Sequence, residues 1–162
     1  IRGGAGNTTL EDGSVDLIVA AQAFHWFHTA ETRCEFSRIL KPDGHIALIW
    51  NERQIDSTPF LREYEDLLLE FGTDYSEIRH ENIDEEAIAS FYRGPWTRAS
   101  FPNSQSFDFE GLRGRLLSCS YVPPAGHADY EPMLAELHRI FDRHQSGGTI
   151  RFDYDTRVYL GQ

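Results

Sequence analysis

Cysteine is scarce and long hydrophobic runs are absent, and each shortage excludes a class of protein. The two cysteines, Cys34 and Cys119, are far apart and lack metal-ligand or CxxC spacing, which argues against a disulfide framework and a zinc site. No uncharged apolar run approaches the ~18 residues that a membrane span needs, and the first residues lack the pattern of a secretory signal. We therefore expect a cytoplasmic protein with no membrane partner.

Basic residues are also in short supply. The 162 residues include 26 acidic and 15 basic side chains, which gives a formal net charge of -11. Such a surface repels the phosphate backbone of nucleic acids, so we do not expect a nucleic-acid partner. With 40% hydrophobic and 25% charged residues, the composition is that of one globular domain, residues 1–162.

Methionine occurs once, at Met133, and the sequence begins with Ile1. A translation start is therefore not included, and we expect the chain to be a fragment of a longer protein.

Two short apolar segments predict a parallel sheet. Val15 to Ala21 and Gly44 to Trp50 are almost continuously apolar, as is typical of strands buried on both faces. The segment Thr29 to Leu40 has helical periodicity, and we expect Lys41 to Gly44 to form a turn after it. A strand, a helix and a strand make a right-handed crossover, which indicates the α/β class.

The rest of the chain predicts further helices and a last strand. Thr58 and Pro59 are typical of a helix start, and Gly72 of its end. The other expected elements are a short helix about 84–92, one or two strands within 96–109, a helix from Pro132 to His144, and a terminal strand with Ile150, Phe152, Tyr154, Thr156 and Val158 on its buried face.

The candidate functional residues follow the two confident strands, because ligands of open α/β sheets bind at the carboxyl ends of the strands. The first set runs from Ala21 to Phe27, and the second is Asn51, Glu52 and Arg53. Both sets combine aromatic side chains with a few polar groups, as small-molecule pockets do.

Each candidate has an alternative role in the structure. His25 is either a general base, with a pKa near neutrality, or a packing histidine beside Trp26. Arg53 either holds a substrate carboxylate or forms a surface salt bridge with Glu52 or Asp56. Tyr121 and the two serines before it either face a pocket or terminate a helix.

Two other chemistries are not favoured. His25, His28 and Glu31 do not have the i, i+4 histidine spacing of a zinc protease, so we expect no metal. The sequence has no GxSxG motif, which argues against a hydrolase triad.

Several motifs occur in an order that points to one family. They are DGSVDLIVAAQAFHWF, then ILKPDGHIALIWNER, and later SCSYVP and FDYDTRVYLG. Together they resemble the central and C-terminal parts of class I S-adenosylmethionine-dependent methyltransferases of the small-molecule type, often called type 11. The resemblance covers nearly the whole chain and is weak between Thr73 and Phe107.

The resemblance implies a partial Rossmann-like sheet with flanking helices, containing strands 4-5-7-6 of the family order. Val15 to Ala21 would be the fourth strand and Gly44 to Trp50 the fifth. The strand from Thr149 would lie antiparallel beside the fifth.

The resemblance also implies contacts with the cofactor, S-adenosylmethionine. Ala5 and Gly6 match the place where the family touches the adenine, although Gly6 departs from the acidic or polar residue that is common there. Ala21, Gln22 and Ala23 match the loop that passes the methionine portion of the cofactor.

Other matched residues lie near the reacting groups. By the resemblance, His25 and Trp26 are near the methyl group, where an aromatic face favours a sulfonium cation. His25 is the candidate catalytic base, and Arg53 and Tyr121 are substrate-side candidates.

The cofactor-binding half of the family domain has no counterpart in this sequence. Neither the glycine-rich loop after the first strand nor the acidic residue after the second is present, and Gly3 to Gly6 is not that loop. The apolar fourth strand would then have an unpaired edge, which would dock a missing segment, another chain or a second copy as a homodimer.

Two functions remain open at this point. The resemblance predicts that the parent protein methylates a small molecule and that this fragment alone is inactive. The alternative is a non-catalytic α/β scaffold or dimerisation module derived from a methyltransferase.

Overall fold

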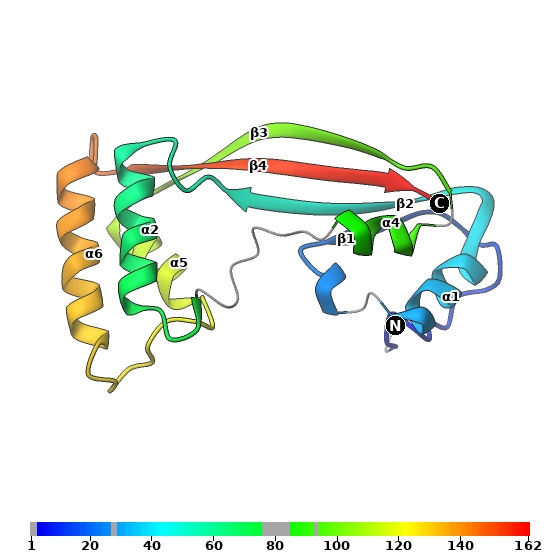
Figure 1. Ribbon diagram of the computed structural model, residues 1–162, viewed down its shortest axis with the longest axis horizontal. Helices are drawn as coiled ribbons and strands as arrows, with labels where there is room; N and C mark the ends of the chain where they lie inside the picture. Colours follow the sequence, from blue (N-terminus) through cyan, green and yellow to red (C-terminus); the bar gives the residue numbers. More distant parts are fainter. Residues whose placement is uncertain (1–2, 27–28, 76–84, 93) are drawn as a thin grey trace. The chain divides into compact units, whose positions relative to one another are not determined.

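A computed structural model of the chain describes residues 3–26, 29–75, 85–92 and 94–162. The described residues form a mixed α/β structure (Figure 1). Its elements are, in order, β1 (Val15–Ala21), the 3-10 helix η1 (Phe24–Trp26), α1 (Ala30–Ile39), β2 (Leu40–Arg53), α2 (Pro59–Phe71), α4 (Glu85–Phe91), β3 (Thr97–Phe107), α5 (Phe109–Leu117), α6 (Tyr130–His144) and β4 (Ile150–Gly161).

The strands have the order β1-β2-β4-β3 within the described residues. β1 pairs with β2 in parallel, with Ile18 opposite Ile46. Later residues of β2 meet earlier residues of β4, since Gln54 N–H donates to the Asp153 carbonyl and the Thr156 hydroxyl donates to Asn51 Oδ1. β4 therefore runs antiparallel to β2, as the arrows of Figure 1 show. The expected order 4-5-7-6 is confirmed, with β4 as the inserted strand.

The chain divides into two compact units. One unit consists of Ile1–Glu52, Asn82–Phe101 and Asp155–Gln162, and the other of Arg53–Glu81 and Pro102–Tyr154. We call them the β1 unit and the α2 unit after an element that each contains, and we describe each by itself.

The core of the β1 unit is rich in aromatic residues. The ring of Phe24 packs edge-on against Trp50 and Phe91, with centroids 5.8 and 4.8 Å apart. The buried hydroxyl of Tyr92 donates to the Tyr159 carbonyl at 2.9 Å, which satisfies its polar group inside the core. Helix α4 thereby covers this part of the sheet, and the short helix predicted near 84–92 is confirmed over Glu85–Phe91.

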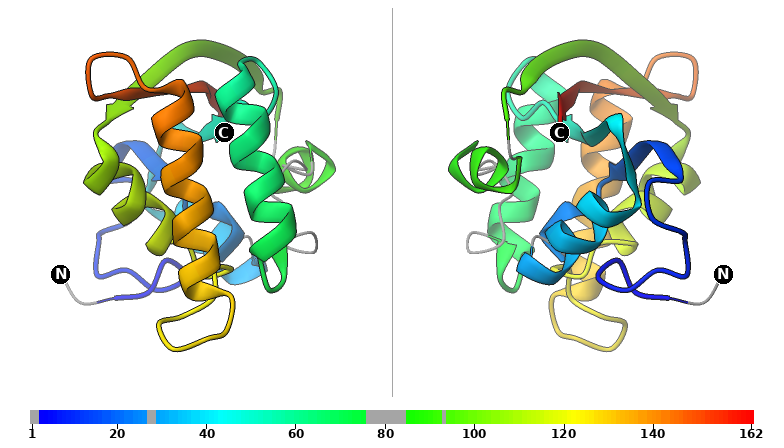
Figure 2. Two further views of the ribbon diagram at one scale, coloured as in Figure 1. Left: turned by 90° about the vertical axis from the view of Figure 1, so that its left-hand side faces the viewer. Right: turned by 90° about the vertical axis from the view of Figure 1, so that its right-hand side faces the viewer.

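The core of the α2 unit lies between helices and strand β4. Helices α2 and α6 pack side by side, and α5 packs against α6, as Figures 1 and 2 show. The buried ring of Phe152 meets Phe60 and Tyr64 edge-on, each with centroids 5.0 Å apart. These aromatic contacts fix β4 beneath the helices.

Helix α2 begins and ends where the sequence predicts. Thr58 caps the helix by accepting a hydrogen bond from Leu61 N–H at 3.1 Å, and Pro59 occupies its first turn. Gly72 follows the last turn with a φ of −67°, so it is not needed for a left-handed conformation. A Cβ there would lie 2.6 Å from the Cβ of Tyr75, so close packing is the reason for glycine.

The turn expected at Lys41 to Gly44 is wrong. Strand β2 begins at Leu40, directly after α1, and continues through this segment. The register to β1 changes there, because Val15 faces Leu40 whereas Leu17 faces His45. The extra residues of β2 are accommodated as an irregularity within the strand, which lets the chain change from helix to sheet without a separate loop.

Burial of β1 on both faces is also wrong for this chain. Leu17 and Val19 are 52% and 54% exposed, and Ala20 is the buried residue of the strand. Among the described residues β1 has one neighbouring strand, β2, so it lies at the sheet edge. The unpaired apolar edge that the resemblance implied is therefore present in the structure.

The terminal strand changes its buried face along its length. Ile150, Phe152 and Tyr154 are buried as predicted, but Val158 is partly exposed and Tyr159 is buried instead. The change falls after Tyr154, where β4 passes from the α2 unit to the β1 unit. The two ends of the strand thus pack into different cores, which a single alternating pattern does not predict.

We expect Gly44→Ala to destabilise the β1 unit by about 1–3 kcal/mol, because overpacking forces neighbouring atoms apart. A Cβ at this position would lie 2.6 Å from Leu40 Cγ and 3.1 Å from the Asp16 carbonyl oxygen. Urea unfolding at constant slope measures the loss. Gly94→Ala is the control, since no atom lies within 4 Å of its added Cβ. Equal stability of the two variants would contradict the close-packing argument.

Candidate functional site

The predicted cofactor residues Ala21, Gln22 and Ala23 lie where β1 leaves the sheet. Gln22 N–H donates to the Ile49 carbonyl at 2.9 Å, and Gln22 Nε2 donates to the Asn51 carbonyl at 3.0 Å. These bonds hold the end of β1 beside the end of β2. Gln22 has a φ of 51°, a left-handed conformation that is rare for a residue with a side chain. The chain thereby turns sharply at this point, and such strained positions cluster at functional sites.

The helix η1 presents His25 and Trp26 at the surface of the β1 unit. Both rings are exposed, Trp26 by 79%, and their centroids lie 4.8 Å apart. Phe24 is buried and anchors the turn through its edge-on contacts with the core. Phe24 is therefore a positioning residue, whereas Trp26 offers an open aromatic face. Phe27, also in the expected set, lies outside the described residues.

Ala5 and Gly6 form a tight turn against helix α1. Asn7 N–H donates to the Gly4 carbonyl at 3.0 Å, which closes the turn. A Cβ on Gly6 would lie 3.3 Å from the Cβ of Glu31 and 3.6 Å from the backbone nitrogen of Thr32. The close approach of α1 explains why this chain has glycine where the family commonly has a polar or acidic side chain.

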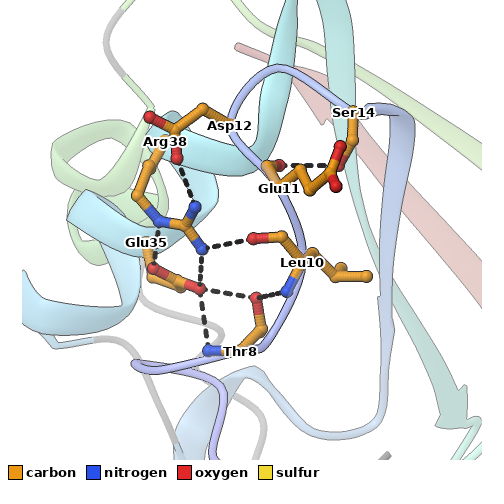
Figure 3. Close-up of polar contacts among 7 residues, drawn as sticks. All are labelled: Thr8, Leu10, Glu11, Asp12, Ser14, Glu35 and Arg38. Carbon is orange, nitrogen blue, oxygen red and sulfur yellow. Dashed lines mark hydrogen bonds and ion pairs between the residues drawn. The ribbon is translucent and has the colours of Figure 1, made fainter.

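A charged network ties the segment after this turn to helix α1 (Figure 3). The backbone N–H and the hydroxyl of Thr8 both donate to Glu35 Oε1, at 2.7 and 2.5 Å. Arg38 donates to both carboxylate oxygens of Glu35, to the Leu10 carbonyl at 2.8 Å, and to Asp12. Helix α1 thus holds residues 8–12, which lie between the predicted adenine turn and strand β1.

This network keeps Glu35 ionised although its side chain is almost fully buried. The hydrogen bonds from Arg38 and then from Thr8 lower the pKa of Glu35 from 4.5 to about 2, and burial opposes them. The sequence carries one signal of this pair, the i, i+3 spacing of Glu35 and Arg38. That spacing is equally typical of a surface pair, so sequence reasoning missed the role of both residues.

Arg53 is buried in the α2 unit, with 10% of its side chain exposed. It forms an ion pair with Glu65, and its Nη2 donates to the Tyr75 hydroxyl at 3.0 Å. The salt bridge that was the alternative to a substrate carboxylate is therefore present, but it is buried, and its partner is Glu65 of α2 instead of Glu52 or Asp56. Glu52 instead pairs with Arg157 at 2.9 Å.

Tyr75 links the two predicted substrate-side residues. Its hydroxyl donates to Glu65 Oε2 at 2.8 Å, beside Arg53, and its ring lies 4.9 Å from that of Tyr121. Burial raises the pKa of Tyr121, so its hydroxyl stays neutral at ordinary pH. Arg53 and Tyr121 therefore share one cluster, whereas His25, Trp26 and the cofactor candidates belong to the β1 unit. Tyr75 is not part of a recognisable sequence motif, so only its contacts in the structure reveal that it belongs to this cluster.

Neither a metal site nor a membrane span occurs in the part of the chain that the structure describes. No group of three histidine, cysteine or acidic side chains there has the arrangement of metal ligands. No helix among the same residues is long and apolar enough to cross a membrane. His28, considered above with His25 and Glu31, lies outside the described residues.

Comparisons with known proteins agree with this arrangement. Residues 1–48 match the model of a family described as "Methyltransferase domain". Two uncharacterized methyltransferase or methyltransferase-like proteins of Schizosaccharomyces pombe are 31% and 32% identical to this chain, and each match covers 94% of it. The chain spans 60% and 61% of the length of these two relatives.

A solved structure assigned to a type II methyltransferase of Anaeromyxobacter dehalogenans has a similar fold. Its TM-score is 0.66 at 20% identity, and the match covers 98% of this chain and 68% of that one. The match extends over the α2 unit and the C-terminal strand, which lie beyond the region of the family model.

We expect the Glu35 network to weaken in acid. The folded-state pKa of about 2 lies below the ordinary 4.5, so stability from Glu35 is complete above about pH 4.5 and is lost as pH falls toward 2. Thermal melts of wild type and Glu35→Gln across this interval measure it, and their difference should shrink in acid. Glu70→Gln removes an exposed carboxylate as control. A difference that stays constant would show that Glu35 is not held by the network.

Proposed function

We propose that this chain is part of a class I methyltransferase and that its parent protein transfers a methyl group from S-adenosylmethionine to a small-molecule acceptor. The observation that carries the proposal is the turn after β1, where strained Gln22 leads to an open pair of aromatic rings at the carboxyl end of a parallel strand. We place the reaction in the cytoplasm, in line with the composition.

The residues of the β1 unit fit one wall of a cofactor site. Backbone groups at Ala5 and Gly6 suit the adenine, and the turn of Ala21 to Ala23 suits the methionine portion. The exposed face of Trp26 suits a sulfonium cation, which an aromatic quadrupole attracts. S-adenosylmethionine supplies an already activated methyl group, so proximity and orientation by these residues do most of the catalytic work.

His25 is the candidate base for an acceptor that must lose a proton. Its ring is exposed beside Trp26, and an ordinary imidazole titrates near neutral pH. As the acceptor atom forms its bond to the methyl carbon, the carbon–sulfur bond breaks and the sulfur keeps the electron pair. The proton of the acceptor then passes to the imidazole of His25.

Arg53 and Tyr121 remain our proposed substrate residues, and within the α2 unit Tyr75 contacts both of them. The glycine-rich loop and the ribose-binding acid are proposed to lie in an N-terminal half outside this sequence. We therefore treat residues 1–162 as the C-terminal portion of one methyltransferase domain, inactive by itself.

One observation favours the alternative of a scaffold or dimerisation module. The edge strand β1 exposes Leu17 and Val19, which can pair with a second copy of the same strand. The two functions differ in whether the cofactor binds, so one titration separates them.

We expect S-adenosylhomocysteine to bind the longer gene product and not the 162-residue chain. The 162-residue chain supplies one wall of the proposed site and should hold the ligand weakly. The longer protein should be stabilised by about 2.7 kcal/mol when the ligand is present at 100 times its dissociation constant. Calorimetry or the shift in melting temperature measures both proteins. Tight saturable binding by the 162-residue chain would contradict its incompleteness. Binding by neither protein would contradict the methyltransferase proposal and favour the scaffold.

We expect His25→Ala in the longer protein to lower kcat about 10²- to 10⁴-fold, which is the usual contribution of a general base. The affinity for S-adenosylhomocysteine should stay within about twofold, because the imidazole contacts the acceptor. His127→Ala, at an exposed loop histidine, is the control. Unchanged turnover in His25→Ala would assign His25 to packing instead.

A further inference from the structure

The turn after β1 contains a strained residue. Among the described residues, Gln22 is the one non-glycine residue with a positive φ, at 51°. A glycine would adopt this conformation at little cost, whereas a residue with a Cβ keeps it only when surrounding contacts compensate for the strain. The contacts of Gln22 therefore explain why the turn keeps its shape.

Both amide groups of Gln22 donate to the end of strand β2. The backbone N–H donates to the Ile49 carbonyl at 2.9 Å, and Nε2 of the side chain donates to the Asn51 carbonyl at 3.0 Å. The second bond needs an amide side chain, so a glycine at this position would lose it. Because Gln22 is exposed, water competes for this bond, and its contribution to global stability is small. Its main effect is to orient the turn.

Asn51 is itself held by strand β4. The Thr156 hydroxyl donates to Asn51 Oδ1 at 2.9 Å, and both residues are half-buried. A second contact joins the next residue of each strand, since Glu52 pairs with Arg157 at 2.9 Å. The end of β2 is thus fixed on the side that faces β4, while its carbonyl groups bond to Gln22 on the side that faces β1.

The geometry points to Asn51 and Thr156 as positioning residues for the cofactor turn. The hydrogen bonds form one chain across three neighbouring strands, from Thr156 through Asn51 to Gln22, and all three residues belong to the β1 unit. Thr156 fixes the side chain of Asn51, and Asn51 then keeps its carbonyl directed at Gln22. The two residues act on the cofactor through Gln22 and do not contact it themselves.

This inference rests on the proposed function in naming S-adenosylmethionine as the ligand of the turn. The hydrogen bonds do not need a ligand, so their effect on Gln22 can be measured separately. A residue that only stabilised the fold would change the unfolding midpoint. A positioning residue changes the affinity for the ligand while the midpoint stays nearly the same.

The first test is amide hydrogen exchange at Gln22 in the 162-residue chain without ligand. Thr156→Val removes the hydroxyl and keeps the branched shape, and we expect the Gln22 N–H to exchange about threefold or more faster. Thr156→Ser keeps a hydroxyl and should restore the wild-type rate. Thr97→Val, at an exposed position of β3 in the same unit, is the matched control. A wild-type rate in Thr156→Val would overturn the proposed chain of bonds.

The second test is the affinity of the longer protein for S-adenosylhomocysteine, measured by calorimetry. Gln22→Met keeps the length of the side chain and removes its amide. We expect Gln22→Met and Thr156→Val each to bind about three- to tenfold more weakly, as the loss of a neutral hydrogen bond implies. The double variant should bind within about twofold of Gln22→Met, because both changes interrupt the same chain. Additive losses, or unchanged affinity in Thr156→Val, would overturn the positioning role.

Urea unfolding of the same variants separates positioning from general stability. The midpoint of Thr156→Val should stay close to that of Thr97→Val at constant slope. A large drop in the midpoint that accompanied the loss of affinity would overturn the positioning role and make Thr156 a purely structural residue. If the wild-type longer protein failed to bind S-adenosylhomocysteine, the methyltransferase proposal would be overturned. The exchange rate would still decide whether Thr156 holds the turn at Gln22.

Discussion

Parallel pairing of β1 with β2 is the constraint on which the candidate cofactor site depends. Parallel strands cannot be joined by a tight turn, so the chain must cross back through helix α1. Both strand ends then lie at the same edge, where Gln22 bonds to the backbone of Ile49 and Asn51. The sharp bend at Gln22 follows from this pairing. After the bend, His25 and Trp26 lie exposed at the surface.

Helix α1 does more than connect the two strands. Through Glu35 and Arg38 it also binds the loop from Thr8 to Asp12, which precedes β1. The energetic basis is a buried carboxylate that accepts hydrogen bonds from a backbone N–H, a hydroxyl and a guanidinium. Such a network is favourable only when every member is satisfied. The network thereby holds the segment that follows the predicted adenine turn at Gly6.

The α2 unit also contains a buried ion pair between an arginine and a glutamate. Arg53 and Glu65 are nearly enclosed, and a buried pair gains stability only if further hydrogen bonds support it. Burial alone would lower the pKa of Arg53, but the bond to Glu65 raises it above its ordinary value. Tyr75 completes the pair, because its hydroxyl accepts a hydrogen bond from Arg53 and donates one to Glu65.

Local pattern was enough for the elements whose cause is local. Strand β1 and the Thr58 and Pro59 start of α2 followed from the local sequence, because apolar patterning and capping act between near neighbours in the chain. The strand order was implied by the family resemblance, not by local pattern. Tertiary structure alone decided the partner of Arg53, the anchoring by Glu35 and the change of buried face along β4. These features depend on which side chains from distant segments contact each other. The sequence does not show whether a charged residue is exposed to water or pairs with a buried partner.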